Sequence, residues 1–158
     1  MSAATQGTFR LGLDVGGTFT DCVAIGPDGA VMFDAHCALP PPFLIQLAGA
    51  IQAYDVTYIE EPAVPGNIEV FKRIKQHVKI PLAVGEQART IWDIIPYLQE
   101  RIAEFVQIDL AHTGGISQML KMATLGEVHQ AALAPHSVTS DLGMSANLQV
   151  SASVPLFL

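Results

Sequence analysis

Short apolar runs alternate with longer segments in which apolar residues recur every three or four positions. Continuous apolar runs occur before Asp34 and at 56–59, 82–84, 105–108, 132–134 and 154–158. Such runs are typical of buried parallel strands, because both faces of the strand are covered. The segments between them carry the apolar stripe of a helix, as in Phe43, Leu44, Leu47 and Ile51. The pattern predicts strand–helix units repeated along the chain.

Helix start signals agree with this division. Asn67 and Thr90 are suitable N-caps for a second and a third helix, although Pro96 should kink the third. A fourth helix, with Ile116, Leu120 and Ala123 on its apolar stripe, is predicted after the pair Gly114–Gly115, and a weaker one near Ala146–Val150.

The first part of the chain has a different pattern. Residues 9–13 and 19–25 predict antiparallel strands joined by glycine turns, with no helix between them. We therefore expect a β-hairpin over residues 1–25 and a separate α/β unit over residues 26–158. A complete eight-unit barrel needs about 250 residues, and this chain has 158. The predicted fold is an incomplete (β/α)8 TIM-type barrel of about six parallel units, preceded by the hairpin.

Acidic residues and histidines follow the predicted strands at regular intervals. Asp34, Glu60, Glu86, Asp109 and His136 are separated by 26, 26, 23 and 27 residues, the length of one strand–helix unit. Parallel strands gather their carboxyl ends at one edge, where barrel and open α/β folds place their chemistry. These side chains are therefore expected to meet.

The residue types indicate metal-assisted proton transfer. Asp34, Glu60 and Glu86 offer only hard oxygen ligands, which suit Mg²⁺ better than zinc. A cation held there can stabilise the enediolate that forms when a proton is removed next to a carboxylate. His136 is the expected base, Asp109 the residue that orients its ring, and His36 the acid that protonates a leaving hydroxyl.

Several neighbouring residues are expected to have ordinary roles. Any one of the acids alone would be a solvated loop residue, and it is their joint spacing that indicates a shared site. Glu61 should point away from Glu60 by strand alternation, and we expect it to support the site or form a salt bridge, with Glu61→Gln having little effect. His77, His112 and His129 are expected to be surface or packing residues.

The charge balance excludes some partner classes. The chain has 15 Asp and Glu against 8 Lys and Arg, a formal charge of −7, which argues against nucleic acid or an anionic membrane as main partner. No apolar run approaches membrane-spanning length. Cys22 and Cys37 have no metal-type spacing, and we expect reduced thiols in a cytoplasmic protein.

Four segments together resemble the enolase superfamily. They are Tyr58–Pro62, Pro81–Glu86, Val106–Asp109 with His112–Ile116, and Ala134–His136; the likeness covers residues 26–158. Within the superfamily they most resemble acid-sugar dehydratases of the D-galactonate dehydratase type, lyases of sugar-acid catabolism that share the C-terminal barrel of mandelate racemase and muconate lactonizing enzyme. The resemblance implies that Asp34, Glu60 and Glu86 bind Mg²⁺. It also implies that Asp109 and His136 remove the α-proton of a sugar acid, and that His36 expels the β-hydroxyl to give a 2-keto-3-deoxy acid. Cys37 stands where that family usually has glycine.

The first residues resemble a different family. Leu11–Asp21 is similar to the first phosphate loop of the hydantoinase A and oxoprolinase family, in which Asp14, Gly16, Gly17 and Thr18 would lie around nucleotide phosphates. Two alternatives to a dehydratase therefore stay open: a non-catalytic metal-binding fragment or fusion, and an ATP-binding module. Open sheet edges would also allow a homo-oligomer.

Overall fold

The computed structural model describes residues 10–15, 20–25, 29–138 and 140–158. Their strands form a single sheet in the sequential order β1-β2-β3-β4-β5-β6-β7. The strands are β1 (Arg10–Val15), β2 (Thr20–Ile25), β3 (Val31–Asp34), β4 (Val56–Glu60), β5 (Leu82–Val84), β6 (Phe105–Val106) and β7 (Ala132–Leu133). Strands β3 to β7 are parallel, whereas β1 pairs with β2 and β2 with β3 in antiparallel fashion. The predicted α/β fold and the N-terminal hairpin are confirmed.

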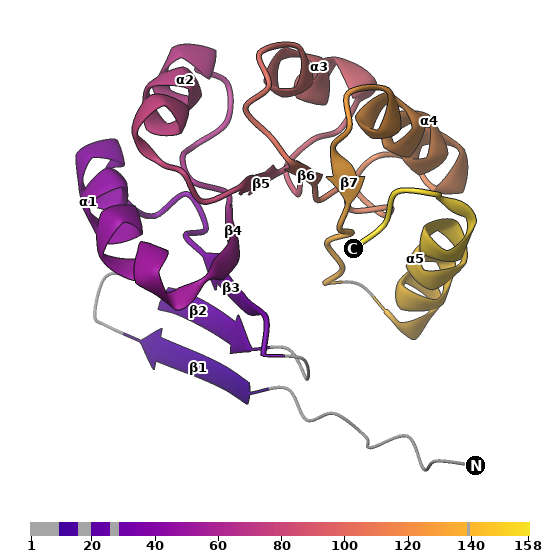
Figure 1. Ribbon diagram of the computed structural model, residues 1–158. Coiled ribbons are helices and arrows are strands. Elements are labelled where there is room, and N and C mark those ends of the chain that lie inside the picture. Colours follow the sequence, from indigo (N-terminus) through magenta and orange to yellow (C-terminus); the bar gives the residue numbers. More distant parts are fainter. Residues whose placement is uncertain (1–9, 16–19, 26–28, 139) are drawn as a thin grey trace.

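Five α-helices follow the parallel strands. They are α1 (Pro41–Ile51), α2 (Ile68–His77), α3 (Ile91–Gln99), α4 (Ile116–Val128) and α5 (Asp141–Ser153), and a short 3-10 helix, Gln52–Tyr54, extends α1. Figure 1 shows the helices side by side in an arc outside the strands, as in a barrel that has not closed. This arrangement places all the carboxyl ends of β3 to β7 at one edge.

The predicted helix caps are present. The Asn67 side chain accepts a hydrogen bond from the backbone N–H of Glu69 at 3.2 Å. Thr90 and Asp93 form a reciprocal capping box at the start of α3, which satisfies N–H groups that the helix cannot pair internally. Pro96, where a kink was expected, lies inside α3, and the helix continues beyond it to Gln99.

The number of parallel strands differs slightly from the prediction. Five parallel strands are present in place of about six, because the last apolar segment forms only a bridge between Phe157 and Leu133 of β7. That bridge is parallel, so the segment follows the predicted direction. The last segment therefore pairs with β7 at one residue, Leu133, and does not form a ladder along it.

Two apolar cores lie between the sheet and the helices. One surrounds Phe71, which packs edge-on against Tyr97 with ring centroids 4.8 Å apart. The other surrounds Met119 and Met122 of α4. Ile116 and Leu120, expected on the buried stripe of α4, are exposed. Within the described part of the chain, no helix is long and apolar enough to cross a membrane.

Candidate active site

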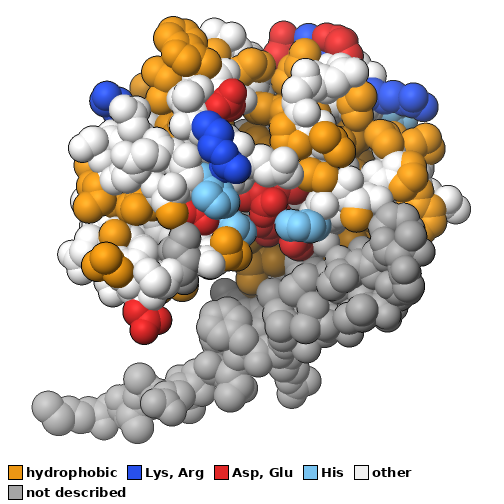
Figure 2. All heavy atoms as spheres, turned by 180° about the vertical axis from the view of Figure 1, so that it is seen from behind, with side chains coloured by type: hydrophobic (Ala, Val, Ile, Leu, Met, Phe, Trp, Pro, Cys, Tyr) orange, Lys and Arg blue, Asp and Glu red, His pale blue; other side chains and the backbone are white. Residues whose placement is uncertain are grey.

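Five of the six predicted site residues line one depression at the carboxyl ends of the parallel strands. The depression has a volume of about 340 Å³ and is bordered by Asp34, His36, Glu60, Glu86 and His136, together with Met32, Tyr58 and Val138. Figure 2 shows acidic and histidine side chains gathered in a hollow of this face. The sixth residue, Asp109, is buried and contacts His136.

Strand pairing brings the acids together. Asp34 and Glu60 are the last residues of β3 and β4 and are register partners. Phe33 and Ile59, directly before them, are buried in the core beneath the helices. Because side chains alternate between the two faces of a strand, Asp34 and Glu60 face the inner side. Glu86 follows β5, with its side chain almost fully buried.

The pKa values show that the acids are crowded. Burial raises the pKa of Glu60 to about 7; a hydrogen bond donated by Gln107 opposes the rise, and the negative charges of Asp34 and Glu86 add to it. Burial also raises the pKa of Asp34, although the hydrogen bond from the backbone N–H of His36 and the charge of His36 act to lower it. Desolvated carboxylates that repel one another favour a cation between them.

The carboxylates nevertheless do not form a finished metal site. Among the described residues, no group of three or more His, Cys, Asp or Glu side chains is arranged so that it could hold a metal ion. His36 Nδ1 lies 3.7 Å from Asp34 Oδ2 and 3.6 Å from Glu86 Oε1, so an imidazole stands between two of the acids. The donor set fits Mg²⁺ chemically, while the expected convergence of three carboxylates is not present in this arrangement.

Asp109 and His136 form a close pair. His136 Nδ1 lies 2.9 Å from Asp109 Oδ2, and its Nε2 lies 3.4 Å from Glu86 Oε2. Burial would raise the pKa of Asp109, but hydrogen bonds from His136 and from the backbone N–H of Ala111 outweigh it, and the net pKa is lowered. An ionised Asp109 can accept a hydrogen bond from Nδ1–H, and Nε2 lies at the depression beside the Glu86 carboxylate.

The backbone after β3 is strained. His36 and Cys37 both have positive φ, at 44° and 58°, a region that costs most side chains about 1–2 kcal/mol per residue. Glycine adopts this conformation freely, which accounts for its usual place after the acid histidine in the resembled family. The turn exposes His36, whose side chain is 64% accessible, at the rim of the depression.

The structure places three further residues at the site. His112 Nδ1 lies 3.0 Å from the carbonyl oxygen of Glu86, so its packing contact is with a predicted site residue. Gln107 donates to Glu60, and Asn147 donates to the carbonyl of His136 at 3.2 Å. Of the three, His112 alone carried a sequence signal, because it follows Asp109 by three positions. By contrast, His77 and His129 are exposed, as expected.

Glu61 fits only one of its two expected roles, support of the site or a salt bridge. Its side chain is 1% exposed, and its Oε1 accepts a hydrogen bond from the backbone N–H of Gly85 at 2.7 Å. No ion pair involves Glu61 in the part of the chain that the structure describes. The expected salt bridge is therefore wrong, and the physical reason is burial beside the ends of two strands, away from any cation.

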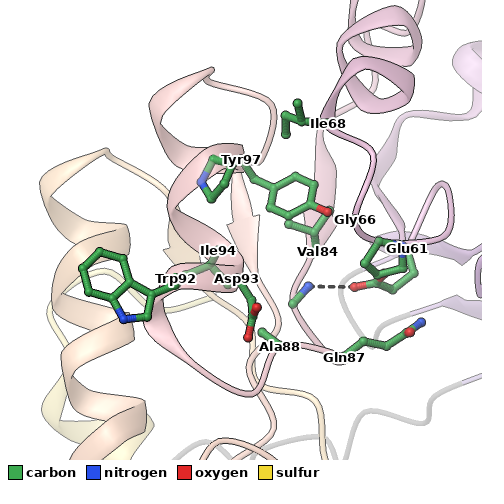
Figure 3. Close-up of a pocket in the computed structure, with 13 residues that line it drawn as sticks. Glu61, Gly66, Ile68, Val84, Gln87, Ala88, Trp92, Asp93, Ile94 and Tyr97 are labelled. Atoms are coloured by element: carbon green, nitrogen blue, oxygen red, sulfur yellow. Dashed lines mark hydrogen bonds between the residues drawn. The ribbon is translucent and has the colours of Figure 1, made fainter.

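A second cavity lies between the strand ends and α3. Its volume is about 340 Å³, and apolar residues such as Ile68, Val84 and Ile94 form much of its lining. Figure 3 shows Trp92 and Tyr97 of α3 on one side and Glu61 on the other. The polar groups at its wall are committed elsewhere, since Glu61 bonds Gly85 and Asp93 caps α3. The titratable groups converge on the first depression, which we therefore take as the site.

The predicted phosphate loop is only partly covered. Gly16, Gly17 and Thr18 lie outside the described residues, and Asp14 is a register partner of Asp21 in the hairpin. The described residues therefore give no support to the resemblance to hydantoinase A and oxoprolinase.

Comparisons with known proteins agree on one family. The family model described as enolase C-terminal domain-like matches residues 22–158. A D-galactonate dehydratase family member from Streptomyces bingchenggensis is 34% identical over 135 residues, which cover 84% of this chain and 33% of that protein. A D-xylonate dehydratase from Haloferax volcanii is 31% identical over 132 residues, covering 84% and 32%.

A solved structure of a member of the enolase superfamily from Salmonella Typhimurium superimposes with a TM-score of 0.80 at 26% identity, covering 84% of this chain and 34% of that one. This chain thus spans about a third of the length of the curated relatives it matches. Because the family model matches 22–158, most of the chain, and the fold agrees with a solved member of the superfamily, the protein belongs to the enolase C-terminal domain-like family.

Proposed function

We propose that this chain carries the proton-transfer and metal-binding part of an acid-sugar dehydratase, which converts an aldonate to a 2-keto-3-deoxy acid. The observation that carries the proposal is the Asp109–His136 pair, whose second imidazole nitrogen lies 3.4 Å from Glu86 in a depression that Asp34 and Glu60 also border. The related dehydratases act on sugar acids by name, which supports this substrate class.

His136 is the proposed base. Its Nδ1–H is held by Asp109, so Nε2 can take the proton from the carbon next to the substrate carboxylate. Ionised Asp109, buried beneath the ring, stabilises the imidazolium that results. Since Asn147 holds the backbone carbonyl of His136, the ring is positioned from two sides.

His36 is the proposed acid. It is exposed at the rim on the opposite side of Glu86 from His136, where its imidazolium N–H can reach a hydroxyl one carbon beyond the abstracted proton. The C–O bond breaks, the oxygen takes the proton of His36, and water leaves. The remaining enol becomes the 2-keto-3-deoxy acid when it takes up a proton at the neighbouring carbon.

Asp34, Glu60 and Glu86 are the residues that would hold Mg²⁺. When bound, the cation supplies positive charge against the negative charge that develops on the substrate carboxylate as the α-proton leaves. The pKa values of Asp34 and Glu60, raised by burial and then by neighbouring negative charges, support this assignment, because a bound cation would favour the charged forms of both acids.

The test combines turnover with proton exchange. The chain is incubated with Mg²⁺ and galactonate, gluconate, mannonate or xylonate; 2-keto-3-deoxy product is measured, and exchange of the C2 hydrogen is followed by NMR in D₂O. We expect at least one substrate to react, His136→Asn to abolish both signals, and His77→Ala, on the exposed end of α2, to leave them unchanged. An unreactive chain that still binds Mg²⁺ would favour the non-catalytic metal-binding alternative instead.

A further inference from the structure

Glu61 lies at the junction of three strand ends. It follows β4, its own N–H donates to Ala83 of β5 at 2.9 Å, and its carbonyl accepts from the N–H of Cys37 at 2.8 Å. Its carboxylate accepts from the N–H of Gly85 at 2.7 Å, shown as a dashed line in Figure 3. One residue therefore links the segments that follow β3, β4 and β5.

Its remaining contacts reach the same segments. The backbone N–H of Glu86 also donates to the Glu61 carboxylate, and the Cys37 thiol lies 3.5 Å from Oε2. The partners of the Glu61 carboxylate belong to the proposed site or stand next to it in sequence. Glu86 is a site residue, Gly85 directly precedes it, and Cys37 directly follows His36.

The backbone of Glu61 shows that this arrangement is imposed by its surroundings. Its φ is 37°, in the left-handed region that side chains other than glycine rarely adopt. Such strain persists where neighbouring contacts over-determine a conformation, and it is concentrated at functional sites. The left-handed turn follows directly on β4: Glu60 lines the depression, whereas the buried Glu61 lines the cavity beside α3.

We propose that Glu61 is a positioning residue, which sets the spacing of Glu60, Glu86 and His36 through its hydrogen bonds to the ends of β3 and β5. The inference rests on the proposed function, because it concerns the metal-binding acids of that site. Groups that orient metal ligands typically change metal affinity about 10–100-fold when removed.

The test compares Mg²⁺ affinity with stability. Dissociation constants are measured by calorimetry at a temperature at which circular dichroism shows every variant to be folded. Glu61→Ala should weaken Mg²⁺ binding about 10-fold or more, and Glu61→Gln, whose amide oxygen can still accept from Gly85, should recover most of the affinity. Cys37→Ala, which keeps the backbone bond to Glu61, should change the affinity little.

A second control separates positioning from folding. Met119→Ala opens a void in the other core and should lower the melting temperature without changing the Mg²⁺ affinity. In metal-free protein, Glu61→Ala should also speed amide hydrogen exchange at Gly85 and Glu86, whereas Met119→Ala should leave those two amides protected. If Glu61→Ala binds Mg²⁺ as tightly as the unchanged chain while Glu60→Gln does not bind, the inference is refuted and the proposed function stands. If the unchanged chain binds no Mg²⁺, both are refuted.

Discussion

Replacing Glu60 by glutamine should stabilise the metal-free protein at alkaline pH. The pKa of Glu60 is raised to about 7 by burial and by the charges of Asp34 and Glu86. Between its ordinary value of 4.5 and about 7, the folded chain holds a proton that the unfolded chain has released. The folded state therefore binds more protons in this interval, and the free energy of unfolding falls as the pH rises through it.

The size of the effect follows from the shift. A rise from 4.5 to about 7 corresponds to about 3 kcal/mol at a pH above both values, because one pKa unit is worth about 1.4 kcal/mol. For a chain of this length, 1 kcal/mol moves the melting temperature by about 2–4 °C. Glutamine removes the charge and can still accept the hydrogen bond from Gln107, so at pH 8 Glu60→Gln should melt about 5–10 °C higher.

Thermal melts at pH 5 and pH 8, with a chelator and then with Mg²⁺, provide the assay. At pH 5 the two proteins should melt together, since Glu60 is protonated. With Mg²⁺ at pH 8, the unchanged chain should gain stability and Glu60→Gln should not. Glu127→Gln, at an exposed position of α4, controls for the change of net charge. The quantity to compare is the difference in melting temperature between Glu60→Gln and the unchanged chain. If that difference is no larger at pH 8 than at pH 5, the acids are not crowded.

Three further predictions concern packing and capping, each measured by chemical denaturation. Gly126→Ala should lower the free energy of unfolding by about 1–3 kcal/mol, because a Cβ there would lie 3.0 Å from the carbonyl oxygen of Ala131. Gly49→Ala in α1, which has open space around it, should raise the free energy of unfolding by about 0.5–1 kcal/mol. Equal effects of the two substitutions would contradict the packing of α4 on β7. Asp93→Ala should cost about 1 kcal/mol at pH 7 through loss of the α3 cap. Its pKa is lowered chiefly by the backbone N–H of Arg89, so the loss should shrink as the pH falls below 3.8, and a pH-independent loss would be inconsistent with the cap. Phe71→Ala should cost about 3–5 kcal/mol, as the ring is fully buried against Tyr97; a loss below 1 kcal/mol would contradict that burial.

The sequence alone indicated the architecture because it repeats. Apolar runs separated by amphipathic segments specify parallel strands and their covering helices, and short-range signals such as Asn67 and the Thr90–Asp93 box specify where helices begin. The same period placed Asp34, Glu60, Glu86 and His136 at strand ends. Since parallel strands share one edge, their gathering around a depression followed from the spacing.

The tertiary structure decided what the repeat does not encode. Which face of α4 is buried, with Met119 inside and Ile116 exposed, depends on how the helix packs on its neighbours. The role of Glu61 depends on a left-handed turn and on amides that lie 24 or more positions away in sequence. Asn147 joins the site for the same reason: its hydrogen bond to the carbonyl of His136 exists only once α5 has packed beside that residue, and no local pattern predicts it.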